Sequence, residues 1–579
     1  MRFFIVCISL FYCVSSNAQT FRSLISVDSL KMFHETGGKL DSIDLIIGMP
    51  STTFVGGSWN RLENTLGPNE LLKFNGGQQF YGFSDWKKMR YSGLPHLGFA
   101  YSFGGKGTQF VTATYEQAFK HSILLNLDYT KYRSSGFLRN SEFSHNDLQL
   151  QLNKTGNIYS FELKGAYESS DAEQNDGLLL DSLADNFDLI FLPVRKENAK
   201  LATRRTRLSL TNYFDFIKDS TNAAGLFTQH ELKIKKFSYT EQSDSLFLLY
   251  ASINKDSLIT NDQHQWSQIA NGVGAFWKND FHFLTFGSTL RFWNFQNLGI
   301  YRDTVELNMV ANYTYKRNDL SVRVFSEWNL VGAQNESVHL LSANYKINTF
   351  KFTGSVLYEN KLPDYYQRYA VGNNYASNLQ NPDKQIRFQP VVSVKSAIAG
   401  ISLLATYTFT QLKNNYFFIQ DTWRNDTLGS IRFQQIALRL EYTYRKLTLQ
   451  PNYIFTVSMD PLKITPTHQF QSRLYLKGYI FKARKMLAYT GVDFALLSSF
   501  QRIGYSSNTG AFRLDELSTD NRGYSNLHFF AGFQIEEFKF FLRMENIAYF
   551  WNDKNSEIVK KYPLQSNLLR VGITWDFFN

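Results

Sequence analysis

The stretch that decides the fold is Asn567 to Asn579, which reads NLLRVGITWDFFN. Its residues alternate between an apolar set and a second set that is polar or glycine: Leu569, Val571, Ile573, Trp575 and Phe577 against Arg570, Gly572, Thr574 and Asp576. A period of two is typical of a β-strand with one apolar and one polar face. A terminal strand of a soluble sandwich would show the same pattern. Pairing with the first strand of a closed barrel would remove the exposed edge, and inside a membrane such pairing is obligatory.

The composition of the whole chain favours the membrane barrel. Its 579 residues are 16% aromatic, with 52 Phe, 33 Tyr and 9 Trp. Aromatic residues suit strands and form the two interfacial girdles of outer-membrane barrels. No apolar run approaches the ~20 residues of a transmembrane helix. The formal net charge is +11. Because the first 18 residues are predicted to export the chain, it is not expected to meet nucleic acid, and this charge indicates anionic solutes or lipopolysaccharide phosphates instead.

Residues 1–18 are predicted to be a signal peptide. Arg2 supplies the positive start, an apolar core runs from Phe3 to Val14, and Ser16-Asn17-Ala18 forms a small-residue cleavage site. Both cysteines of the chain, at positions 7 and 13, lie within this segment. The mature chain is therefore expected to lack disulfides and thiolate chemistry.

After the signal peptide the chain divides into two predicted parts. Residues 19–95 are irregular and are interpreted as an N-terminal periplasmic extension, an extra strand pair or a plug. Residues 96–579 alternate almost throughout, as in the run from Val305 to Lys316 and the run from Gln435 to Arg445. This is the pattern of transmembrane strands, with one face toward lipid and one toward water.

The connections between these segments alternate between short and long. Turns such as Glu536-Glu537 and Arg445-Lys446 are followed by long links such as 501–523. The sequence thus predicts an all-β fold, a transmembrane antiparallel up-and-down barrel of about 22 strands (about 18 to 22), with both termini in the periplasm. A soluble propeller or solenoid would show a fixed repeat, and none is present. Pro390 and Pro451 are expected at a bulge or a strand start, because proline cannot donate to the ladder.

Several segments resemble a known family. The stretch YTKYRSSGFLRNSEFSHNDLQLQL at 129–152, NDGLLLDSL at 175–183 and FLRMENIAYFW at 541–551 are similar to segments of the putative β-barrel porin family of Bacteroidetes-type outer membranes. The resemblance covers roughly residues 80–579 and implies an outer-membrane barrel that acts as a porin. The end of the chain also resembles the general barrel-assembly signal, with Arg570, Gly572, Trp575 and Phe577, although it stops at Asn579 rather than at an aromatic residue.

Two groups of residues are candidates for the channel itself. The alternation turns one set of charged residues toward the lumen, where they line the pore or form ion-pair ladders along its wall: Lys316, Arg439, Glu441, Arg473, Lys477, Arg543 and Glu545. The link over 168–207 is acidic in its first half and basic in its second. It is interpreted either as a solvated external loop or as a loop folded into the lumen that constricts the pore, with these candidates: Asp176, Asp181, Asp185, Arg195, Lys196, Arg204 and Arg205.

The sequence therefore predicts a porin of the Gram-negative cell outer membrane, a passive diffusion channel for small hydrophilic solutes. The first alternative is a plugged barrel that acts as an interaction or assembly scaffold. A barrel enzyme is the weaker alternative, because the ten histidines are scattered without the spacing of a metal site. No cofactor, metal or nucleic acid is expected. The expected partners are outer-membrane lipid, lipopolysaccharide, the barrel-assembly machinery and small solutes; the sequence leaves solute selectivity, gating and oligomeric state open.

Overall fold

The computed structural model describes residues 53–55, 58–60 and 86–578, with short gaps at 157, 180–186, 219–220, 245, 247–248, 251, 333–334, 378, 380, 426–429, 460–462, 516–521, 551–556 and 565. The predicted signal peptide lies outside the described residues. Of the predicted extension, the described parts are 86–95 and a two-stranded hairpin of β1 (Thr53–Val55) and β2 (Ser58–Asn60).

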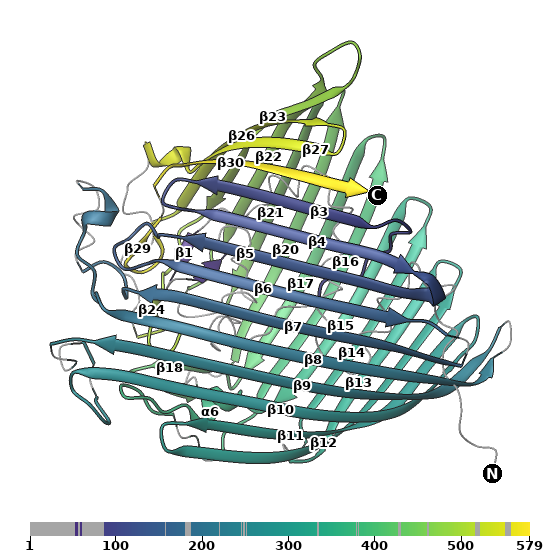
Figure 1. The fold of residues 1–579 in the computed structure, drawn as a ribbon, viewed down its shortest axis with the longest axis horizontal. Coiled ribbons are helices and arrows are strands. Elements are labelled where there is room, and N and C mark those ends of the chain that lie inside the picture. The colour runs from purple at the N-terminus through teal and green to yellow at the C-terminus, as the bar shows by residue number, and fades with distance from the viewer. Residues whose placement is uncertain are drawn as a thin grey trace.

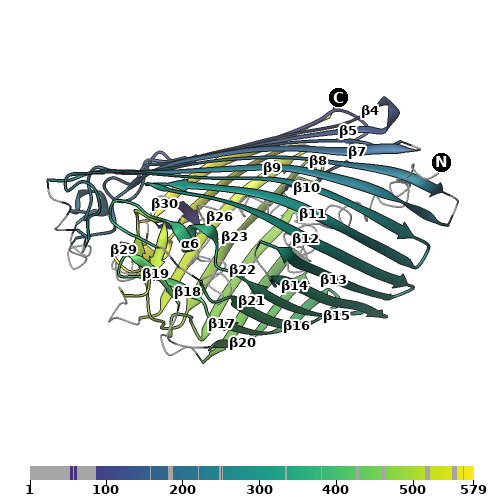
Figure 2. The ribbon, with the colours of Figure 1, turned by 90° about the horizontal axis from the view of Figure 1, so that it is seen from below.

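The main body of the chain is a closed antiparallel barrel (Figures 1 and 2), which confirms the predicted fold class and strand number. Its first strand β3 pairs with its last strand β30, so that the sheet has no free edge. The 22 strands are β3 (His96–Gly104), β4 (Gln109–Phe119), β5 (Ile123–Ser134), β6 (Phe143–Lys154), β7 (Tyr159–Gln174), β8 (Ala199–Lys218), β9 (Ala223–Gln242), β10 (Ile259–Lys278), β11 (His282–Asn297), β12 (Ile300–Arg317), β13 (Leu320–Val331), β14 (Ser337–Ile347), β15 (Phe350–Lys361), β16 (Gln385–Ile398), β17 (Ile401–Lys413), β20 (Ser430–Tyr444), β21 (Leu447–Ser458), β22 (His468–Tyr479), β23 (Met486–Leu497), β26 (Tyr524–Ile535), β27 (Phe538–Glu545) and β30 (Leu568–Phe578).

The outward face of the barrel is apolar. On β30, Trp575 is 44% exposed and Phe577 is 39% exposed, and their rings stack at 4.5 Å between centroids. Leu284, Phe286 and Leu290 continue this exposed face on β11. An apolar band around a closed barrel suits contact with lipid chains rather than water. No helix among the described residues is long and apolar enough to cross a membrane.

The two ends of the barrel differ. At one end the strands are joined mostly by tight turns, in which Asn318 and Asn348 adopt φ values of 49° and 50°. Asparagine tolerates the left-handed conformation that such hairpin turns require. At the other end most links are long, and the start of β3 and the C-terminus lie at the short-turn end, away from them (Figure 1).

The long links contain the remaining short elements. These are the helix α6 (Tyr365–Tyr369), the strands β18 (Tyr416–Ile419), β19 (Thr422–Asn425), β24 (Gly504–Ser506), β25 (Ala511–Arg513), β28 (Glu557–Val559) and β29 (Tyr562–Pro563), and the 3₁₀ turns η4 (Leu189–Phe191) and η6 (Ile547–Phe550). A further 3₁₀ turn, η2 (Lys120–Ser122), connects β4 to β5 at the short-turn end.

The expectation for the two prolines was wrong. Pro390 lies inside β16 and Pro451 lies inside β21, and the register with the neighbouring strands is the same before and after each of them. Pro390 is paired with Val356 of β15, whereas its pairing toward β17 is interrupted. In an antiparallel strand each N–H points toward one neighbour only, so a proline can break one ladder and leave the other intact.

Candidate functional site

The candidate functional site is the interior of the barrel, whose wall carries many polar and ion-paired side chains. Arg205 lies 2.9 Å from Glu168, and Arg207 lies 2.7 Å from Glu231. Arg291 forms a further pair with Glu327 at 2.8 Å. The alternation of each strand produces this wall, because every second side chain points inward.

All seven predicted pore-lining residues occupy inward-facing positions of their strands. Arg473 of β22 lies 2.7 Å from Asp493, and Arg543 of β27 lies 3.4 Å from the same carboxylate. Glu545 lies 3.6 Å from Arg543. The remaining four candidates are Lys316 on β12, Arg439 and Glu441 on β20, and Lys477 on β22. Whether they line an ion path remains a prediction.

The residues of the predicted barrel-assembly signal lie on both faces of β30. Arg570 is fully buried inside the barrel, 3.2 Å from Glu545. A Cβ at Gly572 would lie 2.4 Å from the Phe541 ring, so this position admits only glycine without rearrangement. Trp575 and Phe577 face outward. Their role in assembly remains a prediction.

The long links fold over the mouth of the barrel as one cap (Figure 2). β19, β18, β25 and β24 form a four-stranded sheet from two different links. Phe417, Phe418 and Trp423 are at most 1% exposed. Their buried cluster includes Phe237 of β9 and Phe433 of β20, and the strands β10 to β17 separate these two on the ring. The cap thus contacts widely separated parts of the wall.

The structure places only some of the predicted constriction-loop residues in the loop. Asp176, Arg195 and Lys196 lie in the link between β7 and β8, as expected. Asp181 and Asp185 lie outside the described residues. Arg204 and Arg205 were wrongly assigned to the loop.

Both arginines lie in β8, because β7 and β8 pair as far as Gln174 and Ala199. Arg204 points outward and binds Asp171 at 2.7 Å, whereas Arg205 is buried in the wall. The high density of charges concealed the strand, since its inward positions carry ion pairs rather than apolar side chains.

Lys196 ties the β7–β8 link to two other links. Its Nζ donates to Tyr250 Oη at 2.5 Å and to Ser507 Oγ at 2.8 Å, and it lies 3.7 Å from both Asp176 and Glu241. Its side chain is only 2% exposed.

The Asp176 carboxylate also accepts a hydrogen bond from the Ser507 amide at 3.2 Å. Burial by itself raises the pKa of Asp176, but Lys196 and Arg195 outweigh it and hold that pKa below its ordinary value.

A second inward-folded link was missed by the sequence analysis. The connection from β15 to β16 carries α6, which begins with a capping box at Asp364 and Gln367. Tyr375 lies within hydrogen-bond distance of His264 on β10, and the amide of Asn373 donates to Asp262 at 2.8 Å. Only its Asp-x-x-Gln spacing could have indicated a helix, and nothing in it indicates the wall that it contacts.

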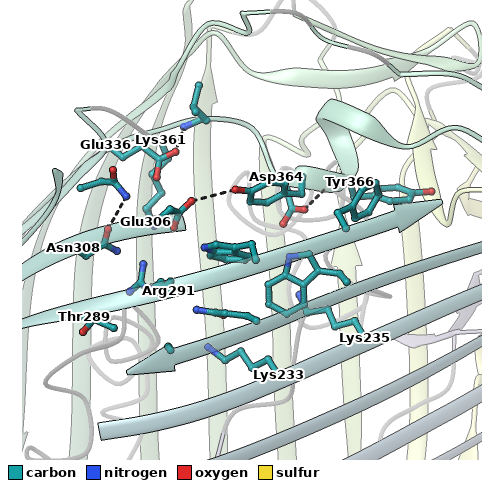
Figure 3. Close-up of a pocket in the computed structure, with 18 of the residues that line it drawn as sticks. Lys233, Lys235, Thr289, Arg291, Glu306, Asn308, Glu336, Lys361, Asp364 and Tyr366 are labelled. Atoms are coloured by element: carbon teal, nitrogen blue, oxygen red, sulfur yellow. Dashed lines mark hydrogen bonds between the residues drawn. The ribbon is translucent and has the colours of Figure 1, made fainter. Parts of the chain in front are cut away.

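A cavity of about 520 Å³ lies between this link and the inner wall (Figure 3). Trp266 and Trp293 line it with ring centroids 4.9 Å apart, and Tyr365 stacks on Trp293 at 5.1 Å. Lys235 lies over the Trp266 ring at 4.5 Å. Charged residues complete the lining: Arg207, Glu231, Lys233, Arg291, Glu306, Glu327, Glu336, Lys361, Asp364 and Arg368. Aromatic surfaces beside groups of both charges suit a small polar solute.

Trp86, Lys87 and Arg90 contact side chains of the inner wall. Arg90 binds Glu116 at 2.7 Å and Asp128 at 2.9 Å, and Lys87 Nζ donates to Thr130 at 3.0 Å. The guanidinium of Arg207 lies 4.7 Å from the centre of the Trp86 ring. Residues 86–90 of the predicted extension are therefore inside the barrel. Residues 61–85 lie outside the described residues.

Within the described part of the chain, no group of three or more His, Cys, Asp or Glu residues is arranged to hold a metal ion. Several of the acidic residues named above are instead engaged by arginine, such as Glu231 by Arg207 and Glu545 by Arg570.

Comparisons with known proteins agree with this architecture. A family model described as "Putative porin" matches residues 91–579. A comparison with curated protein sequences gives no match.

Similar solved structures include the FrpB iron transporter from Neisseria meningitidis (TM-score 0.59, 9% identity, 86% of this chain and 84% of that chain). The siderophore receptor PirA from Acinetobacter baumannii is similar to the same degree (TM-score 0.60, 12% identity, 85% and 81%). At these identities the likeness shows the fold alone. These proteins are named as a transporter and a receptor, not as enzymes.

Proposed function

The chain belongs to the family described as "Putative porin", and from this premise we propose that it is an outer-membrane channel through which small hydrophilic solutes diffuse. The observation that carries the proposal is the polar inner wall, together with the cavity of about 520 Å³ that opens against it. A barrel with charged residues inside and apolar residues outside suits passage of water-soluble molecules across a bilayer.

The cap gives this channel a closed state. Its links bury Phe418 and Trp423 among themselves and against the wall. A solute that enters from the capped end therefore needs the cap to shift. Loops that cover a site commonly move on microsecond to millisecond timescales.

The test is electrical recording from the purified protein in a planar bilayer, after heat-modifiable gel mobility has shown that the barrel is folded. We expect discrete conductance steps that become more frequent when the cap is weakened by Lys196→Met. The proposal is wrong if the folded, inserted protein gives no steps with either the wild-type chain or this variant.

A second candidate is a barrel that serves as a scaffold, its interior occupied by its own N-terminal segment. The ion pairs of Arg90 with Glu116 and Asp128 favour this candidate, because they hold 86–90 against the inner wall. Deletion of 19–95 distinguishes the two functions. Steps that appear only after the deletion would identify an occluded barrel, whereas silence before and after it would support the scaffold.

A further inference from the structure

Three lysines form a row across adjacent strands of the inner wall, near the short-turn end. Lys346 of β14 is the direct cross-strand partner of Lys351 of β15, which is in turn the partner of Lys395 of β16. The first two flank the β14–β15 turn. Lys346 lies on the same, inward face of β14 as Ser342, which is 1% exposed. Lys351 lies on the same, inward face of β15 as Leu357, which is 9% exposed.

The row continues beyond β16. Lys395 is paired with Leu404 of β17, and Leu404 is paired with Arg439 of β20. We call Lys346, Lys351, Lys395 and Arg439 the basic row. It contains one of the residues that the sequence analysis assigned to the pore and three that it did not single out.

Many cations of the wall have acidic partners, whereas the four residues of the basic row have none in the described part of the chain. None of its four residues forms an ion pair with any residue that the structure describes, whereas Arg473 lies 2.7 Å from Asp493 and Arg570 lies 3.2 Å from Glu545. The nearest inward acid on β20 is Glu441, which accepts a hydrogen bond from Gln450 at 3.2 Å. Opposing carboxylates thus neutralise other parts of the wall but not this one.

Like charges that are directly opposite on neighbouring strands destabilise a sheet. Their side chains are about 5 Å apart at Cβ, and the repulsion is relieved when an anion lies between them. Rings of lysine and arginine are also the means by which anion pores select their solutes. A row of lumen-facing cations without acidic partners would therefore be stabilised by a bound anion and would favour anions in the pore.

We propose that the basic row is a binding site for small, multiply charged oxyanions, solutes that carry several phosphate, sulfonate or carboxylate groups. It gives the channel a preference for anions at its short-turn end. This inference deepens the proposed function by naming a solute class, but the binding itself is measurable without conductance.

The first test uses the trisulfonate dye 8-hydroxypyrene-1,3,6-trisulfonate as the probe, in equilibrium dialysis against the full-length protein in neutral detergent. We expect the probe to bind at low ionic strength and to be released by salt, because exposed charges are screened. The variant K346Q/K351Q/K395Q should bind the probe at least tenfold more weakly.

A matched control removes the same number of charges from the outward face. Lys131, Lys200 and Lys236 are exposed and point away from the lumen. The variant K131Q/K200Q/K236Q should bind the probe as the wild-type protein does. If the triple variant of the basic row fails to show heat-modifiable mobility, the single variant Lys351→Gln replaces it, since Lys351 lies between the other two lysines.

The second test measures reversal potentials in a KCl gradient across a planar bilayer. We expect the wild-type channel to prefer chloride and the triple variant of the basic row to lose that preference. Conducting channels with equal reversal potentials, or equal probe binding by the wild-type protein and the variant, would overturn the inference and leave the channel function intact. Probe binding that depends on the row in a protein without conductance would support the inference and refute the channel.

Discussion

Replacement of Lys196 by methionine is expected to loosen the cap. Methionine retains the length of the side chain and removes the ammonium group, which lies 3.7 Å from both Asp176 and Glu241. The hydrogen bonds to Tyr250 and Ser507 are lost with it. Glu241 would then have no ion-pair partner among the described residues, and Asp176 would keep only Arg195, at 3.8 Å.

The size of the effect follows from this burial. Removing one partner of a buried ion pair costs about 3–5 kcal/mol. Since every ~1.4 kcal/mol is tenfold in an equilibrium constant, the cap should open roughly a hundredfold to several thousandfold more often. The barrel should remain folded, because the lysine lies in a link and contributes nothing to the strand ladder.

Hydrogen exchange measured on the folded protein reports this opening residue by residue. The amides of Leu178 and Ser507 donate within the cap, to the carbonyl of Lys561 at 2.9 Å and to Asp176 at 3.2 Å. Both should exchange faster in Lys196→Met, whereas amides of the barrel strands should not change.

Arg195→Ala is the matched control. The Arg195 side chain is 23% exposed and lies 3.8 Å from Asp176, so its loss should cost about 1 kcal/mol or less. The reasoning is refuted if exchange in the cap is unchanged in Lys196→Met, or if the two variants accelerate it equally.

Three further predictions concern the cap, the last strand and the wall. Basic neighbours outweigh burial and lower the pKa of Asp176. Its contribution to cap stability is therefore present above its unfolded pKa of about 3.9 and is lost as pH falls through the lower folded value. Hydrogen exchange in the cap should accelerate only below about pH 4, and acceleration at neutral pH would contradict this. Gly572→Val should abolish heat-modifiable mobility, since its Cβ would lie 2.4 Å from a neighbouring ring, whereas Gly354→Ala, with nothing within 4 Å, should fold normally. The double variant Arg439→Glu with Arg473→Glu should shift reversal potentials toward cations, and unchanged potentials would count against these residues as part of the ion path.

The contacts within the cap could not be predicted from sequence patterns. Phe417, Phe418 and Trp423 lie in the long link between β17 and β20, and they are among the most buried of the described residues. Their partners come from links more than 80 residues away, such as Phe512. Sequence spacing contains no record of such contacts, because they depend on how the barrel brings its links together.

The sequence by itself determined the barrel. The alternation in β30 and its predecessors, with tight turns such as Glu536-Glu537 between them, follows from the backbone geometry of a strand, which turns successive side chains to opposite faces. That rule is local, so the inward residues and the strand number could be predicted without coordinates.

Only the tertiary structure decided which residues each inward side chain contacts. Arg473 and Arg439 have the same sequence pattern, but the register of the sheet places Asp493 opposite Arg473 and Leu404 beside Arg439. The register likewise aligns Lys346 with Lys351. Charge neutralisation and repulsion depend on distances between strands, and these distances are fixed by pairing across the sheet rather than by order along the chain.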